Sequence, residues 1–437
     1  MKPVSLAQSP HASPQTDTKT WIICAVCFAI MAVDGFDTAS IAYVAPTLAL
    51  QWHIAPAALT PAFVATSIGA VLGYLLSGAL VERWGRRNVM SAAMFAFGAL
   101  SLATAFAGSI GAIAAMRGIT AICLGCVVPA AISCTADQAG ERFRAAATVA
   151  ATTGLSAGAA LGGLLAALLI ARYGWQSVFV VGGVLPLVLL PFVRLALRGT
   201  DPGEAGGVSP GNTGNAANTS NAAAQENSSR PRLSALFQRP FALTTVLIWA
   251  IAFVAFLVTY QFMFWVPTLL VSYGFAPATA ALGSAASALG GIAGNLVLLA
   301  LVGRYGVQRS LIALAALAIG CIVCLGLLPL GQGAVLLLIA GVGAGTTSSC
   351  VGQATLAVLS YPAALRTTAV GGAAAAGRVG AIVGPATAGA LLSLGFASQR
   401  IVLLSCVPIA LTIVLLALSY LHARRQRSIA ASAAPAV

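Results

Sequence analysis

Apolar runs of about twenty residues recur along the chain, and short polar or basic segments separate them. About twenty apolar residues in helical conformation cross the hydrocarbon core of a bilayer. The pattern therefore predicts an all-α membrane protein with twelve transmembrane helices in two groups of six. The predicted spans are 21–50, 59–81, 88–107, 110–135, 146–170 and 176–197, then 241–267, 280–302, 310–330, 333–359, 368–394 and 400–421.

A polar break divides the two groups. Residues 199–240 begin with a stretch rich in Gly, Asn, Ser, Ala and Pro, a composition that cannot bury a core. We expect a cytoplasmic linker there, between an N-terminal bundle at 21–198 and a C-terminal bundle at 241–421. Residues 1–20 and 422–437 are predicted to be cytoplasmic tails.

The two halves repeat each other. The segment 79–85, Ala-Leu-Val-Glu-Arg-Trp-Gly, corresponds to 300–306, Ala-Leu-Val-Gly-Arg-Tyr-Gly, at an interval of about 221 residues. Gly73 and Gly294 precede the two segments by the same distance. Repeats of six spans predict a two-bundle transporter with its binding site at the midplane between the bundles.

Composition supports a membrane protein and excludes nucleic-acid binding. Of 437 residues, 59% are hydrophobic and only 7% charged, whereas soluble proteins carry about 25% charged residues. The net charge of +13 comes from basic residues in the tails and in alternate loops, which indicates cytoplasmic termini. The cytoplasmic set is Lys2, Lys19, Arg83, Arg86, Arg87, Arg142, Arg144, Arg194, Arg198, Arg230, Arg232, Arg239, Arg304, Arg309, Arg366, Arg424, Arg425 and Arg427. Only Arg172 and Arg400 fall in the predicted outer loops.

The first span carries two acids, Asp34 and Asp37, in the run Asp-Gly-Phe-Asp. A charge at mid-bilayer costs roughly 2.5–3.5 kcal/mol, so two acids on nearly one helix face indicate a functional site. Repulsion between like charges, together with desolvation, favours a proton on at least one of them. We expect Asp37 to be the leading proton carrier and Asp34 its partner.

Two arginines also lie within apolar spans. Arg117 needs a carboxylate or several carbonyls as partners, and it is either a substrate ligand or a structural tie within the first bundle. Arg378 lies among glycines in the run 377–385, which leave room for a ligand. Its planar fork suits a substrate carboxylate, and the alternative is an ion pair with Asp34 or Asp37.

Further candidate substrate ligands come from the second half. Tyr260 and Phe264 belong to an aromatic cluster in the seventh span, which is either core or a stacking face for a flat ligand. Gln353, in the tenth span, is a candidate hydrogen-bond partner for substrate or for a neighbouring helix.

The loop after the second span concentrates charge at the membrane edge. Gly78-Ala-Leu-Val-Glu-Arg-Trp-Gly-Arg-Arg87 is similar to the loop signature of the major facilitator superfamily, with Glu82 where Asp is commoner. We interpret it as a charge latch, a set of contacts that holds the cytoplasmic side closed. The predicted members are Gly78, Glu82, Arg83, Gly85, Arg86, Arg87, Asp137 and Arg366.

Together, the Asp-Gly-Phe-Asp run, the loop 78–87, Tyr361-Pro362 with Arg366, and the 377–385 run resemble the aromatic acid:proton symporters of that superfamily. The resemblance implies important roles for Asp34, Asp37, Arg117, Asp137, Arg366 and Arg378, with Asp137 where the family usually has Glu. It implies a bacterial inner-membrane protein that imports benzoate-like or hydroxybenzoate-like carboxylates with protons by alternating access. We expect a monomer, although the sequence does not determine the oligomeric state. No cofactor beyond the coupling proton and no metal site is expected.

Two alternatives remain open at this point. A transporter of the same fold for other small organic anions differs only in its substrate. A proton-coupled exporter differs in direction, and the absence of Pro from the glycine-rich fifth span argues against it. An enzyme is not expected, because the sequence shows no nucleophile–base pair, phosphate-binding loop or metal cluster.

Overall fold

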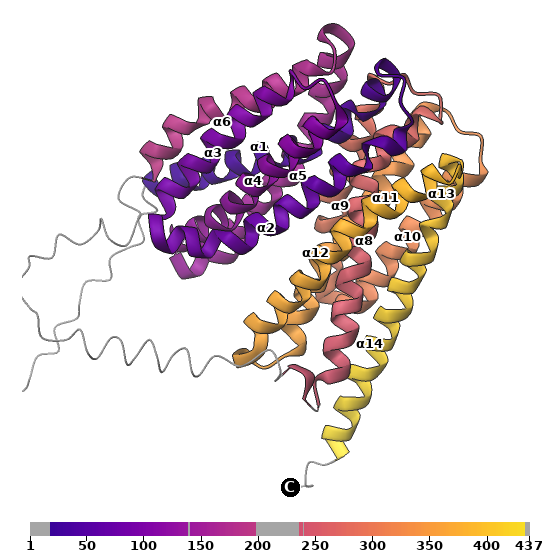
Figure 1. The fold of residues 1–437 in the computed structure, drawn as a ribbon. Coiled ribbons are helices and arrows are strands. Elements are labelled where there is room, and N and C mark those ends of the chain that lie inside the picture. The colour runs from indigo at the N-terminus through magenta and orange to yellow at the C-terminus, as the bar shows by residue number, and fades with distance from the viewer. Residues whose placement is uncertain (1–17, 139, 198–235, 239, 433–437) are drawn as a thin grey trace, which may run out of the picture.

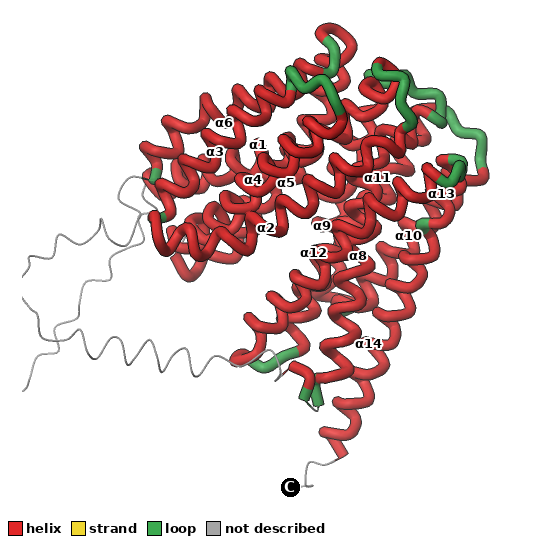
Figure 2. Tube along the Cα trace, viewed as in Figure 1, coloured by secondary structure: helices red, strands yellow, loops and turns green. Residues whose placement is uncertain are grey.

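The computed structural model describes residues 18–138, 140–197, 236–238 and 240–432, with only the backbone at 18–19, 136–138, 140–152, 363–364, 367 and 427–432. Its described part consists of helices joined by short loops and contains no strand (Figure 2). The first bundle comprises α1 (Thr18–Gln51), α2 (Thr60–Trp84), α3 (Arg86–Thr104), α4 (Ile110–Gln138), α5 (Gly140–Tyr173) and α6 (Gln176–Ala196), with a 3-10 turn η1 (Pro56–Leu59). The second comprises η3 (Thr279–Ala281), α8 (Ala242–Val271), α9 (Leu282–Tyr305), α10 (Val307–Leu327), α11 (Gln332–Ser360), α12 (Ala363–Ser393), α13 (Ser398–Leu404) and α14 (Cys406–Ser432).

This architecture confirms the predicted fold class, with two differences in detail. The predicted twelfth span is divided at Ser405 into α13 and α14. Pro408 explains the break, because its nitrogen cannot donate to the carbonyl of Leu404. Helix α3 forms as predicted, but it is not among the eleven described helices apolar enough to cross a membrane. Its first turn, Arg-Arg-Asn, shortens the apolar run.

The internal repeat is visible in the backbone. Six described residues have positive φ angles, and they form three pairs separated by 221 residues: His53 with Gly274, Gly85 with Gly306, and Gly174 with Gly395. Gly85 and Gly306 end α2 and α9 in the same way, each donating its N–H to the valine carbonyl four residues before it. The same turn geometry therefore recurs at equivalent points of both bundles.

Glycines bring the helices of each bundle into backbone contact. A Cβ at Gly158 in α5 would overlap the carbonyl oxygen of Ala32 in α1, and one at Gly380 in α12 would overlap that of Phe253 in α8. Small residues permit this close approach where the bilayer gives no hydrophobic drive for helix association. The 46 glycines of the chain are thus partly a packing requirement.

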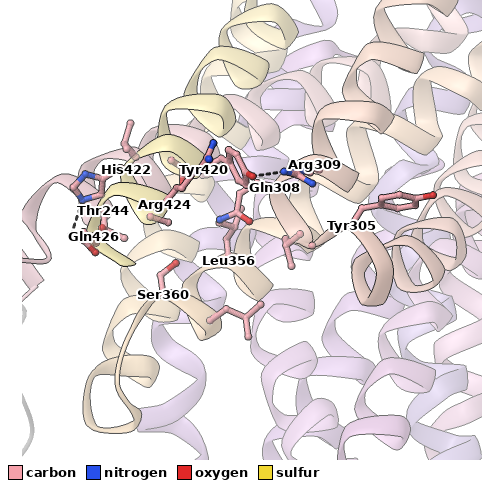
Figure 3. A pocket seen from close by; sticks show the side chains of 16 residues that line it. Thr244, Tyr305, Gln308, Arg309, Leu356, Ser360, Tyr420, His422, Arg424 and Gln426 are labelled. Carbon is pink, nitrogen blue, oxygen red and sulfur yellow. Dashed lines mark hydrogen bonds between the residues drawn. The ribbon is translucent and has the colours of Figure 1, made fainter. Parts of the chain in front are cut away.

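The two bundles meet at the end where η1 packs against α12 and η3 packs against α5, and they diverge toward the opposite end, where α8 begins and α14 ends (Figure 1). At the closed end Phe63 of α2 stacks on Phe264 of α8, with ring centroids 5.1 Å apart, and packs edge-on against Trp265 at 4.9 Å. Near the diverging end, a cavity of about 710 Å³ lies within the second bundle, between α8, α10, α11 and α14 (Figure 3).

Candidate functional site

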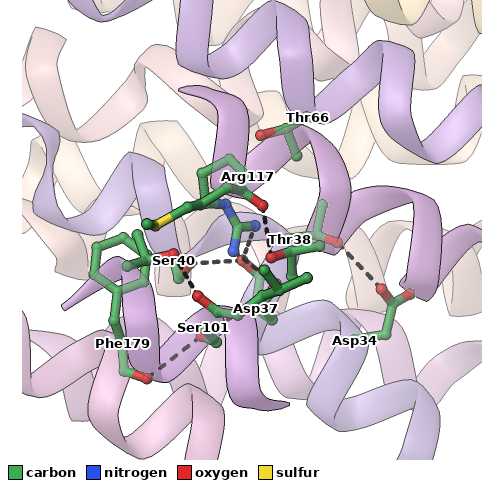
Figure 4. A network of polar contacts seen from close by, with 12 residues as sticks. Asp34, Asp37, Thr38, Ser40, Thr66, Ser101, Arg117 and Phe179 are labelled. Atoms are coloured by element: carbon green, nitrogen blue, oxygen red, sulfur yellow. Dashed lines mark hydrogen bonds and ion pairs between the residues drawn. The ribbon is translucent and has the colours of Figure 1, made fainter. Parts of the chain in front are cut away.

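Asp37 forms a buried ion pair inside the first bundle. Nη1 of Arg117 on α4 donates to Asp37 Oδ2 at 2.8 Å, and its Nη2 donates to the Asp37 carbonyl oxygen at 2.7 Å (Figure 4). Both side chains are 0% exposed. The structure thus places the intramembrane arginine of the first bundle on one of the two acids and away from any open space.

Further hydrogen bonds enclose the same carboxylate. Ser101 Oγ on α3 lies 3.1 Å from Asp37 Oδ1 and 3.3 Å from the carbonyl oxygen of Phe179 on α6. Ser40 donates its hydroxyl to the Asp37 carbonyl at 2.7 Å. The network joins α1, α3, α4 and α6, so Arg117 is a structural tie within the first bundle, and its role as a substrate ligand stays a prediction.

Asp34 has a different setting, although it precedes Asp37 by only three residues. Its side chain is 6% exposed, and the hydroxyl of Thr38 donates to its Oδ1 at 3.2 Å. Figure 4 shows its carboxylate directed away from the Asp37–Arg117 pair. Arg378 and Arg117 are the cations within electrostatic range of Asp34, but within the described residues it makes no salt bridge. The two acids are therefore separated into one paired and one unpaired carboxylate.

Arg378 lies halfway along α12 and reaches across to the other bundle. Its guanidinium carbon is 4.1 Å from the ring centre of Tyr74 on α2 and 5.9 Å from that of Phe256 on α8. Its Nη1 donates to the hydroxyl of Tyr260 at 3.3 Å. Aromatic faces stabilise such a cation without neutralising it. No ion pair of Arg378 with a carboxylate is formed among the side chains that the structure describes, which leaves its charge available to an anion.

The remaining predicted substrate ligands are placed differently. Tyr260 adjoins Arg378 and stacks on Phe256, with centroids 5.9 Å apart. Phe264 is 0% exposed at the closed end, and Gln353 on α11 is 3% exposed, with no hydrogen-bond partner for its Oε1 in the described structure. Tyr74 and Phe256 belong to the site but were not predicted, because only the packing of the helices brings them to Arg378.

The predicted latch residues lie at the diverging end. Gly78, Glu82 and Arg83 are exposed, while Gly85, with φ of 78°, separates α2 from α3, which begins with Arg86 and Arg87. The side chain of Asp137 lies outside the described residues, so its contact with Arg86 or Arg87 stays a prediction. Arg366 is exposed and donates from Nε to the Tyr361 carbonyl at 3.1 Å.

Comparison with known proteins places this geometry in a family. The model of the Major Facilitator Superfamily matches residues 27–385. The 4-hydroxybenzoate transporter PcaK of Pseudomonas putida is 32% identical over 413 residues, which cover 90% of this chain and 91% of that protein. The gallate transporter of Pseudomonas putida is 32% identical over 427 residues, 94% of each chain.

A solved D-xylose-proton symporter superposes with a TM-score of 0.68 at 16% identity and covers 90% of this chain and 97% of its own. At that identity the likeness concerns the fold alone. The family match and the two curated relatives span most of the chain, and the family match includes Asp34, Asp37 and Arg378. The chain therefore belongs to the major facilitator superfamily, and within it to the aromatic acid transporters that its motifs resemble.

Proposed function

We propose that this protein imports small aromatic carboxylates together with protons by alternating access. The observation that carries the proposal is Arg378, a half-buried guanidinium between aromatic faces at mid-helix, with no carboxylate partner among the described side chains. The two relatives from Pseudomonas putida are transporters of 4-hydroxybenzoate and of gallate, both aromatic carboxylates. The guanidinium suits the carboxylate group of such a molecule, and the neighbouring aromatic side chains suit its ring.

Recognition follows from the chemistry of this site. The planar fork of Arg378 offers two parallel N–H donors to a carboxylate, a geometry that an ammonium group does not provide. The rings of Tyr74, Phe256 and Tyr260 lie around the guanidinium and offer offset or edge-on contacts to an aromatic ring. On binding, the guanidinium of Arg378 would replace its cation–π contacts with a charge-assisted hydrogen-bonded pair to the substrate carboxylate. The substrate ring would then pack against the aromatic side chains.

Proton coupling makes uptake of the anion favourable. A monoanion that enters against an inside-negative potential costs about 2.3 kcal/mol per 100 mV, and one accompanying proton removes that cost. The geometry supports Asp34 as the exchanging acid, because Asp37 is held by Arg117 and by Ser101. This proposal reverses the order expected from the sequence, in which Asp37 led.

Orientation completes the proposal. The basic residues indicate that both termini are cytoplasmic, and the relatives from Pseudomonas putida support a location in the bacterial inner membrane. The closed end at η1 then faces outward and the diverging end faces the cytoplasm (Figure 1), which corresponds to an inward-facing state. We propose that the latch contacts form when the cytoplasmic side closes, and that the monomer is the transporting unit.

Transport by proteoliposomes tests the function directly. With a pH gradient, acid outside, the protein should accumulate labelled 4-hydroxybenzoate, and a protonophore should abolish the accumulation. The variant Arg378→Ala should lose it, while Arg400→Ala, which removes an equal charge from α13, should retain it. Substrate movement only outward in exchange for protons would favour an exporter, and accumulation unaffected by the protonophore would refute proton coupling.

A further inference from the structure

The second half of the chain has an unusual charge balance. After Glu226 the sequence contains eleven arginines and no aspartate or glutamate. No arginine of the second bundle can therefore be neutralised by a carboxylate of its own bundle. Arg309 instead contacts the ring and hydroxyl of Tyr420, and Arg366 contacts a backbone carbonyl. Such partners stabilise a cation but leave its positive charge uncompensated.

Part of this charge lines the cavity at the diverging end of the second bundle. The cavity has a volume of about 710 Å³ and is enclosed by the first turn of α10, the last turns of α11, the start of α8 and the C-terminal part of α14 (Figure 3). Arg309 enters it from α10 and Arg424 from α14, and polar groups of Gln308, Ser360 and Ser419 share its wall. Two cations and several hydrogen-bonding groups thus surround one space.

The cavity is preformed by contacts that fix its lining. The guanidinium carbon of Arg309 lies 4.9 Å from the ring centre of Tyr420, to whose hydroxyl its Nη2 donates. On the same helix, His422 and Gln426 are joined by a hydrogen bond of 2.9 Å between their side-chain nitrogens. Two of the five N–H groups of a guanidinium suffice for one phosphate, so the contact with Tyr420 leaves Arg309 further donors.

We propose that this cavity binds a phosphate-bearing anion, in the first place the head group of an anionic phospholipid. Basic pockets between transmembrane helices on the cytoplasmic side suit such head groups. The rim is apolar on the side that meets the bilayer: Leu359, which lines the cavity, is 68% exposed, and Leu421 is 57% exposed. A lipid therefore finds charge for its phosphate and apolar surface for its chains, whereas free phosphate would use the charge alone.

The proposed lipid site is separate from the proposed substrate site. Arg378 lies halfway along α12 between the bundles, and it does not line the cavity, which belongs to the second bundle. The inference uses the proposed orientation only to assign the site to the cytoplasmic leaflet. It concerns a second ligand class and stands whether or not the protein carries aromatic acids.

Thermal unfolding of the purified full-length protein in detergent tests the site. Increasing phosphatidylglycerol should raise the melting temperature until saturation, while phosphatidylcholine should not. Each basic residue near a lipid surface contributes about fivefold in affinity, so Arg309→Gln/Arg424→Gln should raise the half-saturating concentration about 25-fold. The matched control is Arg304→Gln/Arg425→Gln, which removes the same charge from α9 and α14 without altering the cavity lining. If the double variant does not fold, Arg424→Gln alone should give about a fivefold change.

The outcomes distinguish a lipid head group from free phosphate, and binding in the cavity from attraction to general surface charge. A response to sodium phosphate as strong as that to phosphatidylglycerol, at matched ionic strength, would identify a soluble phosphate anion as the occupant of the same site. No response of the wild-type protein to either probe would overturn the inference. An equal loss in the control pair would also overturn it, because general surface charge would then account for the binding.

Discussion

The unequal settings of the two acids in α1 lead to opposite expectations for their neutral variants. Asp37→Asn removes the carboxylate that pairs with Arg117, a side chain that is 0% exposed. Breaking a buried ion pair from one side costs about 3–5 kcal/mol, because the remaining charge stays buried and uncompensated. Asp34→Asn keeps an oxygen that can accept the hydrogen bond from Thr38, and it breaks no ion pair among the described residues, so its cost should not exceed the roughly 0.5–1.5 kcal/mol that such a bond is worth. We expect the first variant to be clearly destabilised and the second nearly as stable as the wild type.

Although Asp34→Asn should be nearly as stable as the wild type, we expect it to lose proton-driven transport. If Asp34 exchanges the coupling proton, Asp34→Asn abolishes accumulation driven by a pH gradient but spares substrate exchange, which moves no net proton. The assay compares accumulation of 4-hydroxybenzoate with counterflow in the same proteoliposomes. Asp37→Asn should lose both in proportion to the loss of folded protein.

A compensating variant separates structure from coupling. Asp37→Asn/Arg117→Met removes both charges and should recover most of the melting temperature lost by Asp37→Asn, because the orphaned cation is gone. The reasoning is refuted if Asp37→Asn melts with the wild type, or if Asp34→Asn still concentrates substrate against a gradient. If both single Asn variants concentrate substrate, neither acid is the coupling site.

Three further expectations concern the proposed substrate clamp, the predicted latch and the glycines that let helices pack. Arg378→Lys keeps the charge but loses the planar fork, so isothermal titration should show much weaker 4-hydroxybenzoate binding, about tenfold or more, and full affinity would rule out the clamp. Asp137→Asn should shift the population toward the inward-facing state, measured by cysteine accessibility at the diverging end, and an unchanged labelling pattern would dismiss the latch. Gly158→Ala should lower the melting temperature by overlapping the Ala32 carbonyl. Gly320→Ala, which has open space in α10, should raise it slightly, since Ala exceeds Gly in helix propensity by about 1 kcal/mol.

Much of the fold could be predicted because the bilayer acts as a uniform solvent. An apolar run must be helical there, since every backbone group has to be satisfied within the segment, and the predicted spans 110–135 and 333–359 fall within α4 and α11. The division of the last span at Ser405 has a local signal in Pro408, but a prediction from apolar runs alone does not take proline into account. The position of one bundle against the other has no such local signal and depends on contacts like that of Phe63 with Phe264.

The site was predictable in its residue types but not in its pairings. Two acids three residues apart suggest one face, yet residues at that spacing are about 60° apart around a helix. That difference directs Asp37 into the first bundle toward Arg117, eighty positions away, and leaves Asp34 without an ion pair in the described structure. Tyr74 was not predicted, because its contact with Arg378 depends on how one bundle packs against the other, and the sequence carries no local signal for that packing.

The absence of acids after Glu226 gives these pairings a mechanistic meaning. Any carboxylate that neutralises Arg378 must come from the first bundle or from a ligand, since its own bundle has none. Asp34, on the first bundle, is within electrostatic range of Arg378, and a bound carboxylate would compete for the same cation. Within the proposed function, competition between the substrate carboxylate and Asp34 for Arg378 would link substrate binding to proton exchange across the interface between the two bundles.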